Sequence, residues 1–175
     1  MPNALFSVPQ AVNEPVYSYA PGTPERERLL STYERMLGER IDIPMFIGGR
    51  EVRTGELRDC RPPHDHQRVI GQYHWGSAIH VQQAVDAALA AHAAWSSMPW
   101  FERAGIFLRA ADLVSGPYRA TINAATMLAQ SKTVHQAEID AACEFADFLR
   151  FNVQFMTEIY AQQPESSPGV WNRME

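Results

Sequence analysis

A run of four helical segments, from residue 77 to about residue 160, constrains the fold of this chain more than any other feature. Apolar residues recur at helical spacing in each segment, as Val81, Val85 and Leu89 do in the first. Ser77 has the residue type of an N-cap, and Pro99 opens the second segment. The pattern predicts helices from residue 77 to just before Pro99, from there to about 115, and over about 118–128 and 134–160.

The N-terminal part of the chain has a different character. Residues 1–22 show no period and are rich in Pro, Asn and Ser, so we expect an extended arm that lies on another surface. Thr23 and Pro24, followed by an acidic residue, are typical of a helix start. This first helix is predicted to run to about Gly38.

A small sheet is expected between the first helix and residue 77. Met45–Ile47 forms one strand of a hairpin, Gly48-Gly49 can take the positive φ of its turn, and the return strand begins at Glu51. A further strand is expected at about residues 67–73. A sheet of this size is not stable alone, so it needs another element to pack on or pair with.

Composition places the chain among ordinary globular proteins and excludes some partners. The 175 residues are 46% apolar and 20% charged. A net charge of −5 argues against nucleic acid or an anionic membrane as the main partner. No apolar run approaches the roughly 18 residues of a membrane span. The start, MPNALFSVPQAVNEP, has no basic region before an apolar core and no Arg, so neither a secretory signal nor a mitochondrial presequence is evident.

One carboxylate stands out in AEIDAACEFADFLRF. At about 100° per residue, Glu144 falls within about 60° of Phe148, Phe151 and Phe155, which places it in an aromatic stripe. A charge there costs several kcal/mol if it is buried and unpaired. Two interpretations stay open: an Arg or backbone donors across a helix interface satisfy Glu144, or it meets a ligand. The nearby acids, Asp140 and Asp147, are interpreted as a solvated face.

No complete catalytic or metal constellation is present in the sequence. Four histidines lie near one another, but no Cys or carboxylate cluster completes a ligand set, so we prefer a solvated turn and predict no metal site; they are His64, His66, His74 and His80. Cys60 and Cys143 are expected to be free thiols in a reducing compartment, and neither has the context of a nucleophile. There is no P-loop, G-x-G-x-x-G, G-x-S-x-G or H-E-x-x-H.

Five stretches together resemble the 1-pyrroline-5-carboxylate dehydrogenase branch of the aldehyde dehydrogenase superfamily. They are IDIPMFIGGREVRTGE, PHDHQRVIGQYHWG, FERAGIFLRAADLVSG, AEIDAACEFADFLRFN and QQPESSPGVWNRME. The resemblance covers about residues 13–175, and AEIDAACE with the following DFLRFN is specific to this branch. Such enzymes have chains of more than 500 residues, so the resemblance implies that this chain is the first third of one.

The resemblance implies an α/β aldehyde dehydrogenase fold for the intact protein, of which this segment is the mostly α-helical part with a small hairpin and arm. Residues 1–40 would be the arm and first helix, and residues 41–76 the hairpin region of an oligomerisation sheet. Residues 77–163 would be the helical part of the NAD-binding domain. Residues 164–175 would begin a strand that leads into a Rossmann-like core. A homo-oligomer formed through the β arm is expected.

The resemblance also implies a reaction. Family members oxidise L-glutamate γ-semialdehyde to L-glutamate with NAD in proline degradation, using a cysteine nucleophile, an oxyanion hole and a cofactor site that would all lie outside this chain. Glu144 matches a position that lines the aldehyde site, where it would meet the substrate's ammonium group, with Phe148 and Phe151 beside it. The compartment would be the cytoplasm in a bacterium and the mitochondrial matrix in a eukaryote.

Competing interpretations stay open at this point. The chain could be a free-standing helical interaction module that exchanges its arm or hairpin with a partner, or a truncated pseudoenzyme. A reading frame that continues past Glu175 favours the dehydrogenase, and a stop codon favours the other two. A fusion with proline dehydrogenase is disfavoured, because Met1 lies close to the arm and leaves no room for that domain.

Overall fold

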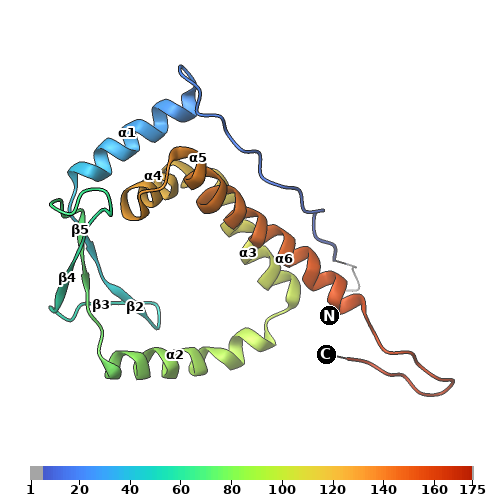
Figure 1. Cartoon of the computed structure of the whole chain (residues 1–175). Coiled ribbons are helices and arrows are strands. Elements are labelled where there is room, and N and C mark those ends of the chain that lie inside the picture. The colour runs from blue at the N-terminus through green and yellow to red at the C-terminus, as the bar shows by residue number, and fades with distance from the viewer. Residues whose placement is uncertain (1–5, 175) are drawn as a thin grey trace.

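A computed structural model describes residues 6–174 and contains helices and two small sheets (Figure 1). The helices are α1 (Pro24–Gly38), α2 (Ala78–Ser97), α3 (Trp100–Ser115), α4 (Arg119–Gln130), α5 (Val134–Ala137), a π-helical turn η1 (Glu138–Cys143) and α6 (Glu144–Ala161). The strands are β1 (Ile41–Ile43), β2 (Met45–Ile47), β3 (Arg50–Val52), β4 (Leu57–Cys60) and β5 (Gly71–His74). In this part of the chain no helix has the length and apolarity needed to cross a membrane.

Local capping signals explain where the helices begin. Thr23 occupies the N-cap position of α1, with Pro24 as the first helical residue. Ser77 caps α2 in a reciprocal arrangement with His80, three residues later. Thr133 does the same for α5 with Gln136. The predicted helix starts are therefore confirmed, and the fourth segment runs without a break from residue 134 to residue 161, but with a π turn inside it.

The hairpin forms as predicted, and a second sheet forms that was not predicted in full. β2 and β3 pair antiparallel around Gly48 and Gly49, whose φ angles are 58° and 75°. The second sheet has the order β1-β5-β4, with β1 parallel to β5. A Cβ at Gly71 would lie 2.7 Å from the carbonyl oxygen of Ile41, so glycine permits this close pairing.

Two details of the predicted strands were wrong. The strand placed at about 67–73 is shorter and begins at Gly71. The strand expected from residue 164 does not form in the described part of the chain; Ser167 and Val170 make an isolated bridge across a turn. A lone extended segment has no partner for its backbone groups, so it does not register as a strand.

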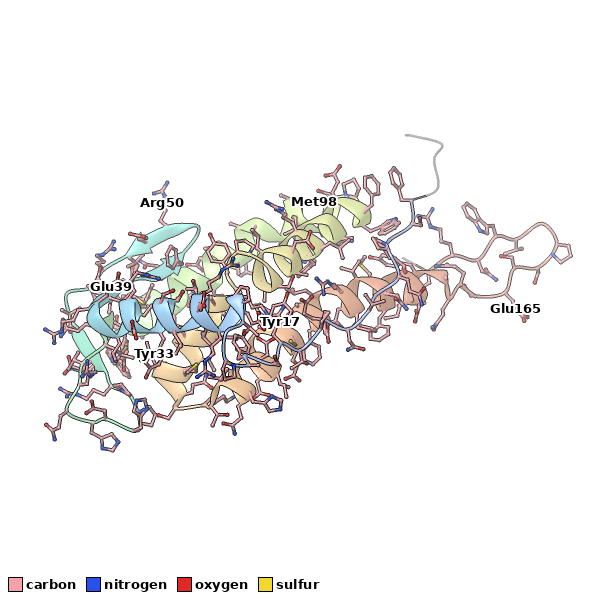
Figure 2. The ribbon with its side chains drawn as sticks, turned by 90° about the horizontal axis from the view of Figure 1, so that it is seen from above. Tyr17, Tyr33, Glu39, Arg50, Met98 and Glu165 are labelled. Atoms are coloured by element: carbon pink, nitrogen blue, oxygen red, sulfur yellow. The ribbon has the colours of Figure 1, made fainter. Side chains whose placement is uncertain are left out.

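The N-terminal arm lies along α6, and Figures 1 and 2 both show the two segments side by side. The arm runs antiparallel to the helix: the backbone N–H of Ala11 donates to Gln154, that of Glu14 to Asp147, and that of Tyr17 to Glu138. From Ala11 to Tyr17 the extended arm spans about 20 Å, at 3.3 Å per residue. From Gln154 back to Glu138 the helix spans about 24 Å, at 1.5 Å per residue. The two ends of the contact therefore lie at similar separations on the arm and on the helix. The predicted arm is confirmed for residues 6–22; residues 1–5 lie outside the described part.

The core lies between α1, α4 and the end of the arm. It is built from Tyr19, Leu29, Met36, Ala124 and Leu128, which are all buried. α1 packs on α4, and α3 packs on α6. These contacts hold the arm and the long helix in one unit, which positions the residues considered below.

Most of α2 lies apart from the other helices (Figure 1), except for an edge-on ring contact of Trp95 with Phe107 of α3, and α2 has no buried residue in the described structure. Its apolar residues at helical spacing are exposed: Val81 by 66%, Leu89 by 69% and Trp95 by 40%. The helix contacts the hairpin, where Gly48 approaches Ala87. The amphipathic pattern therefore predicted the helix correctly, but within residues 6–174 its apolar face has no covering element.

We predict that the 175-residue chain by itself self-associates and binds the dye ANS, because α2 exposes contiguous apolar surface to water. Light scattering and ANS fluorescence measure both properties. A compact monomer with a sharp cooperative thermal melt and no ANS signal would contradict this expectation and favour a free-standing module.

Candidate functional site

An open hollow of about 660 Å³ lies between the arm and the long helix. Its lining residues come from both segments: Asn13, Glu14 and Val16 from the arm, and Ile139, Cys143, Glu144, Asp147, Phe148, Phe151, Asn152 and Phe155 from the helix. The structure thus brings together the carboxylate and the three phenylalanines that the helical spacing places on one face. The contribution of the arm was not foreseen.

Glu144 is exposed in this structure, and its carboxylate has no hydrogen-bond or ion-pair partner among residues 6–174. Its aromatic neighbours are open as well: Phe148 is 57% exposed and Phe155 47%. Phe151 is half-buried, and its ring lies 6.0 Å from that of Phe155. The stripe is therefore real, but the expected desolvation of Glu144 is not found, because the arm covers only one side of the helix.

The buried carboxylate of this segment is Glu138, six residues earlier, whose exposed fraction is 0%. The arm donates to it from the backbone N–H of Tyr17 at 2.8 Å and from the hydroxyl of Tyr19 at 2.7 Å. From α4, Asn123 Nδ2 donates at 2.8 Å, and Arg119 donates from Nε and from a terminal nitrogen. Glu138 is therefore fully satisfied by donors from two other segments of the chain.

Arg119 links this carboxylate to the arm. Its guanidinium donates to Glu14 Oε1 at 2.6 Å and to the carbonyl oxygen of Pro15 at 2.6 Å, and it lies 3.8 Å from the ring centroid of Tyr17. The other oxygen of Glu14 accepts from Arg150 at 2.6 Å. Two carboxylates and two guanidiniums thus form a continuous network between the arm, α4 and the long helix.

Burial and the contacts around Glu138 shift the pKa values of three groups, Glu138, Tyr19 and Cys143. Burial by itself would raise the pKa of Glu138, but the hydrogen bonds from Arg119, Tyr17, Tyr19 and Asn123 outweigh it and hold that pKa below its usual value. The pKa of Tyr19 is raised, by burial first and then by its bond to Glu138. Burial, followed by the charge of Glu138, raises the pKa of Cys143 to about 11. Cys143 is therefore a protonated thiol at neutral pH.

The two acids nearest to Glu144 in the predicted stripe, Asp140 and Asp147, both have partners in the structure. Asp147 does not belong to a solvated face, since it accepts from Asn13 and from the backbone of Glu14, both at 2.7 Å. Asp140 does fit that interpretation, with an exposed ion pair to Lys132 at 2.6 Å.

The solvated-turn interpretation of the histidines is wrong for two of them. His74 is buried and contacts Asp42 and the backbone N–H of Gly55, and His80 caps α2. Across the residues described, no three His, Cys, Asp or Glu side chains are arranged to hold a metal ion.

Sequence reasoning missed Glu138, although a signal was present. Glu138, Ala142 and Ala146 recur every four residues, which is the spacing of a buried small-residue stripe, and all three are buried. On the facing helix, Arg119 and Asn123 have the same spacing and are buried among alanines. A buried ion pair is indicated when a charged residue lies within a stripe of alanines on one helix and an Arg lies within a similar stripe on the facing helix.

We predict that Glu138→Gln lowers the free energy of unfolding at pH 7 by about 3 kcal/mol, because it removes the fully buried charge partner of Arg119 and leaves that guanidinium with Glu14 alone. The folded-state pKa of Glu138 lies below its ordinary value of 4.5, so its contribution is fully present above about pH 4.5 and is lost as the pH falls through the folded-state pKa. Chemical denaturation at a series of pH values should show a constant gap between variant and wild type from pH 6 to pH 8 that narrows below pH 4.5. A gap independent of pH would show that Glu138 carries no charge in the fold.

Comparisons with known proteins show relatives along the whole chain. A delta-1-pyrroline-5-carboxylate dehydrogenase of Agaricus bisporus is 49% identical over 174 residues, which are 98% of this chain and 32% of that protein. The mitochondrial enzyme of that name from Homo sapiens is 42% identical, over 93% of this chain and 29% of its own. The chain therefore spans about a third of the length of the curated relatives that it matches.

Solved structures share the fold. The delta-pyrroline-5-carboxylate dehydrogenase of Mycobacterium tuberculosis, bound with NAD and cobalamin, superposes with a TM-score of 0.97 at 48% identity, over 100% of this chain and 33% of its own. A Thermus thermophilus 1-pyrroline-5-carboxylate dehydrogenase has the same fold at 24% identity, with a TM-score of 0.83. The sequence profile described as the aldehyde dehydrogenase family matches residues 51–175. Because that match covers well over half of the chain, the chain belongs to the aldehyde dehydrogenase family.

Proposed function

We propose that this chain is the N-terminal part of an NAD-dependent dehydrogenase that oxidises L-glutamate γ-semialdehyde, the open form of 1-pyrroline-5-carboxylate, to L-glutamate in proline degradation. The observation that carries the proposal is the likeness along the whole chain, at 48% identity and a TM-score of 0.97, to a structure named for this activity. The curated relatives at 40–49% identity, from fungi to mammals, have the same name.

Glu144 is proposed as the partner of the substrate's ammonium group. Its carboxylate lines the hollow and has no partner among the residues described, so it can accept a cation without breaking an existing bond. Phe148 and Phe151 line the same hollow and offer apolar surface to the hydrocarbon part of the substrate. The other two acids that line the hollow are already engaged, Asp147 by the arm and Glu14 by Arg119 and Arg150.

The chemical step is assigned to parts of the protein outside this chain. A cysteine nucleophile needs a lowered pKa, whereas burial, followed by Asp59, raises the pKa of Cys60, and Cys143 is shifted in the same direction. The positive-φ glycines of residues 6–174 lie in turns, and none belongs to a glycine-rich phosphate loop before a helix, which supports our placing of the NAD site in another part of the protein. NAD, when bound, supplies a hydride acceptor.

The remaining assignments follow the family resemblance. We propose that residues 41–76 contribute to an oligomerisation sheet of a homo-oligomer, and that residues 77–163 belong to the NAD-binding domain, with residues 164–175 leading into its core. The exposed apolar face of α2 supports this placement, since a helix of that kind needs a covering layer. For a eukaryotic source we propose the mitochondrial matrix, since the Dictyostelium discoideum and Bos taurus relatives are named as mitochondrial, and for a bacterial source we propose the cytoplasm.

The 175-residue chain alone is expected to show no dehydrogenase activity, because neither of its thiols is activated and we assign the NAD site to another part of the protein. Purified chain is incubated with glutamate semialdehyde and NAD⁺ while NADH absorbance is followed, and the full-length protein serves as the positive control. NADH formation above a blank without enzyme would show that the nucleophile lies within this segment.

In the full-length protein, we predict that Glu144→Gln mainly impairs handling of glutamate semialdehyde. Loss of an ionic contact to a desolvated ammonium group costs roughly 1.5–3 kcal/mol, or about 10- to 150-fold in kcat/KM. A simple aliphatic aldehyde has no ammonium group, so its kcat/KM should change far less. Steady-state kinetics with both substrates and a thermal melt measure these effects. Equal losses on both substrates, together with a lower Tm, would make Glu144 a structural carboxylate.

A further inference from the structure

We propose that Glu138 is a positioning residue: with Arg119 it holds the long helix in a π turn, and that turn aims Glu144 into the hollow. The role assigned to Glu144 rests on the proposed function, whereas the direction of its side chain does not. Three observations indicate what fixes the direction of the Glu144 side chain: the hydrogen bonds of the π turn, the contacts at the two ends of the turn, and the location of Glu144 directly after it.

The turn contains one residue more than an α-helical turn. η1 covers Glu138–Cys143, and the backbone N–H of Glu144 donates to the carbonyl oxygen of Ile139, five residues earlier. An α-helix would place that bond four residues apart. Because each residue of an α-helix advances the direction of its side chain by about 100°, one extra residue rotates everything after the turn by about that angle. Glu144 is the first residue to be rotated.

Arg119 contacts both ends of the turn. One of its terminal nitrogens donates to Glu138, and it also lies 3.3 Å from Cys143 Sγ. In a regular α-helix two residues five apart point about 140° away from each other, so one guanidinium nitrogen could not reach both. In a π turn, residues i and i+5 lie on the same side. The contacts of Arg119 are therefore compatible with the π turn and not with an α-helical turn.

The arm reinforces this arrangement. Tyr19 and the backbone of Tyr17 donate to Glu138, and Cys143 Sγ lies 3.7 Å from the carbonyl oxygen of Pro15. Tyr19 has a φ of 52°, which is unfavourable for a bulky residue and persists only where the surroundings hold it. Its ring is buried, and its hydroxyl is bound by Glu138 and Asn123. The strained backbone of Tyr19 therefore places the hydroxyl group of this residue, a hydrogen-bond donor, next to Glu138 at the start of the π turn.

The direction of Glu144 follows from this arrangement. Glu138 points inward to α4 and the arm, and Glu144, six residues later, lines the hollow with Phe148 and Phe155. If the turn became α-helical, Glu144 and the phenylalanines after it would rotate by about 100° relative to Glu138. Glu144 and the three phenylalanines would still share one face of the helix, but that face would no longer line the hollow. The buried pair therefore determines where the stripe points, although neither Glu138 nor Arg119 lines the hollow.

Two variants of the full-length protein test the proposal. Glu138→Gln removes the charge that holds Arg119, and deletion of Ala141 removes the extra residue of the turn. Asp140→Asn is the matched control: it makes the same carboxylate-to-amide change in the same turn, at an exposed side chain. Crystal structures show the direction of Glu144, and kcat/KM is measured for glutamate semialdehyde and for propanal, with a thermal melt of each protein.

We expect both variants to rotate Glu144 away from the hollow and to lower the ratio of kcat/KM for the semialdehyde to that for propanal by about ten-fold, mostly through KM. Asp140→Asn should leave this ratio and the structure unchanged. If one variant does not fold, the other decides. Three outcomes would each overturn the proposal. They are an unchanged ratio of kcat/KM values, a changed ratio with the π turn intact, and failure of both variants to fold while the control folds. If the wild type does not oxidise the semialdehyde, the proposed function fails, and the crystal structures still show whether Glu138 sets the direction of Glu144.

Discussion

The buried ion pair between Arg119 and Glu138 is the interaction on which the arm, α4 and the long helix jointly depend. Both side chains are almost completely removed from water, so each alone would carry a large desolvation penalty. They are tolerated because Glu14 and Arg150 complete a network with balanced charge, and because hydroxyl, amide and backbone donors satisfy the remaining oxygen positions. Exposed pairs such as Arg35–Glu39 are screened by water and contribute little by comparison.

The parts of the fold that were predictable are those decided locally. Helix starts at Thr23, Ser77 and Thr133 are marked by residues within three positions of the boundary, and the Gly48-Gly49 turn specifies its own hairpin. β1 and β4 were missed because their pairing depends on β5, which follows them in the chain. Ile41 and Ile43 are also both substantially exposed, so no alternation of buried and exposed residues marks β1.

The candidate site was likewise predictable only where its residues lie close together in the sequence. The shared face of Glu144 and the three phenylalanines was predictable because all four follow the π turn and lie in one regular helix. The buried carboxylate of Glu138 was missed although the alanine stripes mark it, because a constant advance of 100° per residue assumes an unbroken α-helix. The contribution of Asn13 and Glu14 was equally inaccessible, since the arm has no period and its binding depends on residues more than 130 positions later.

The long separation in sequence between the arm and the helix that it binds has a consequence for biosynthesis. The arm leaves the ribosome before the long helix, since Asp147, which binds Glu14, follows 133 residues later. At 5–20 residues per second, the arm waits roughly 7 to 27 seconds before its binding site exists. Throughout that interval its backbone groups are open to water, chaperones and neighbouring nascent chains. Proline and asparagine are poor formers of extended β-structure, so an arm rich in them resists strand pairing with other nascent chains until its helix arrives.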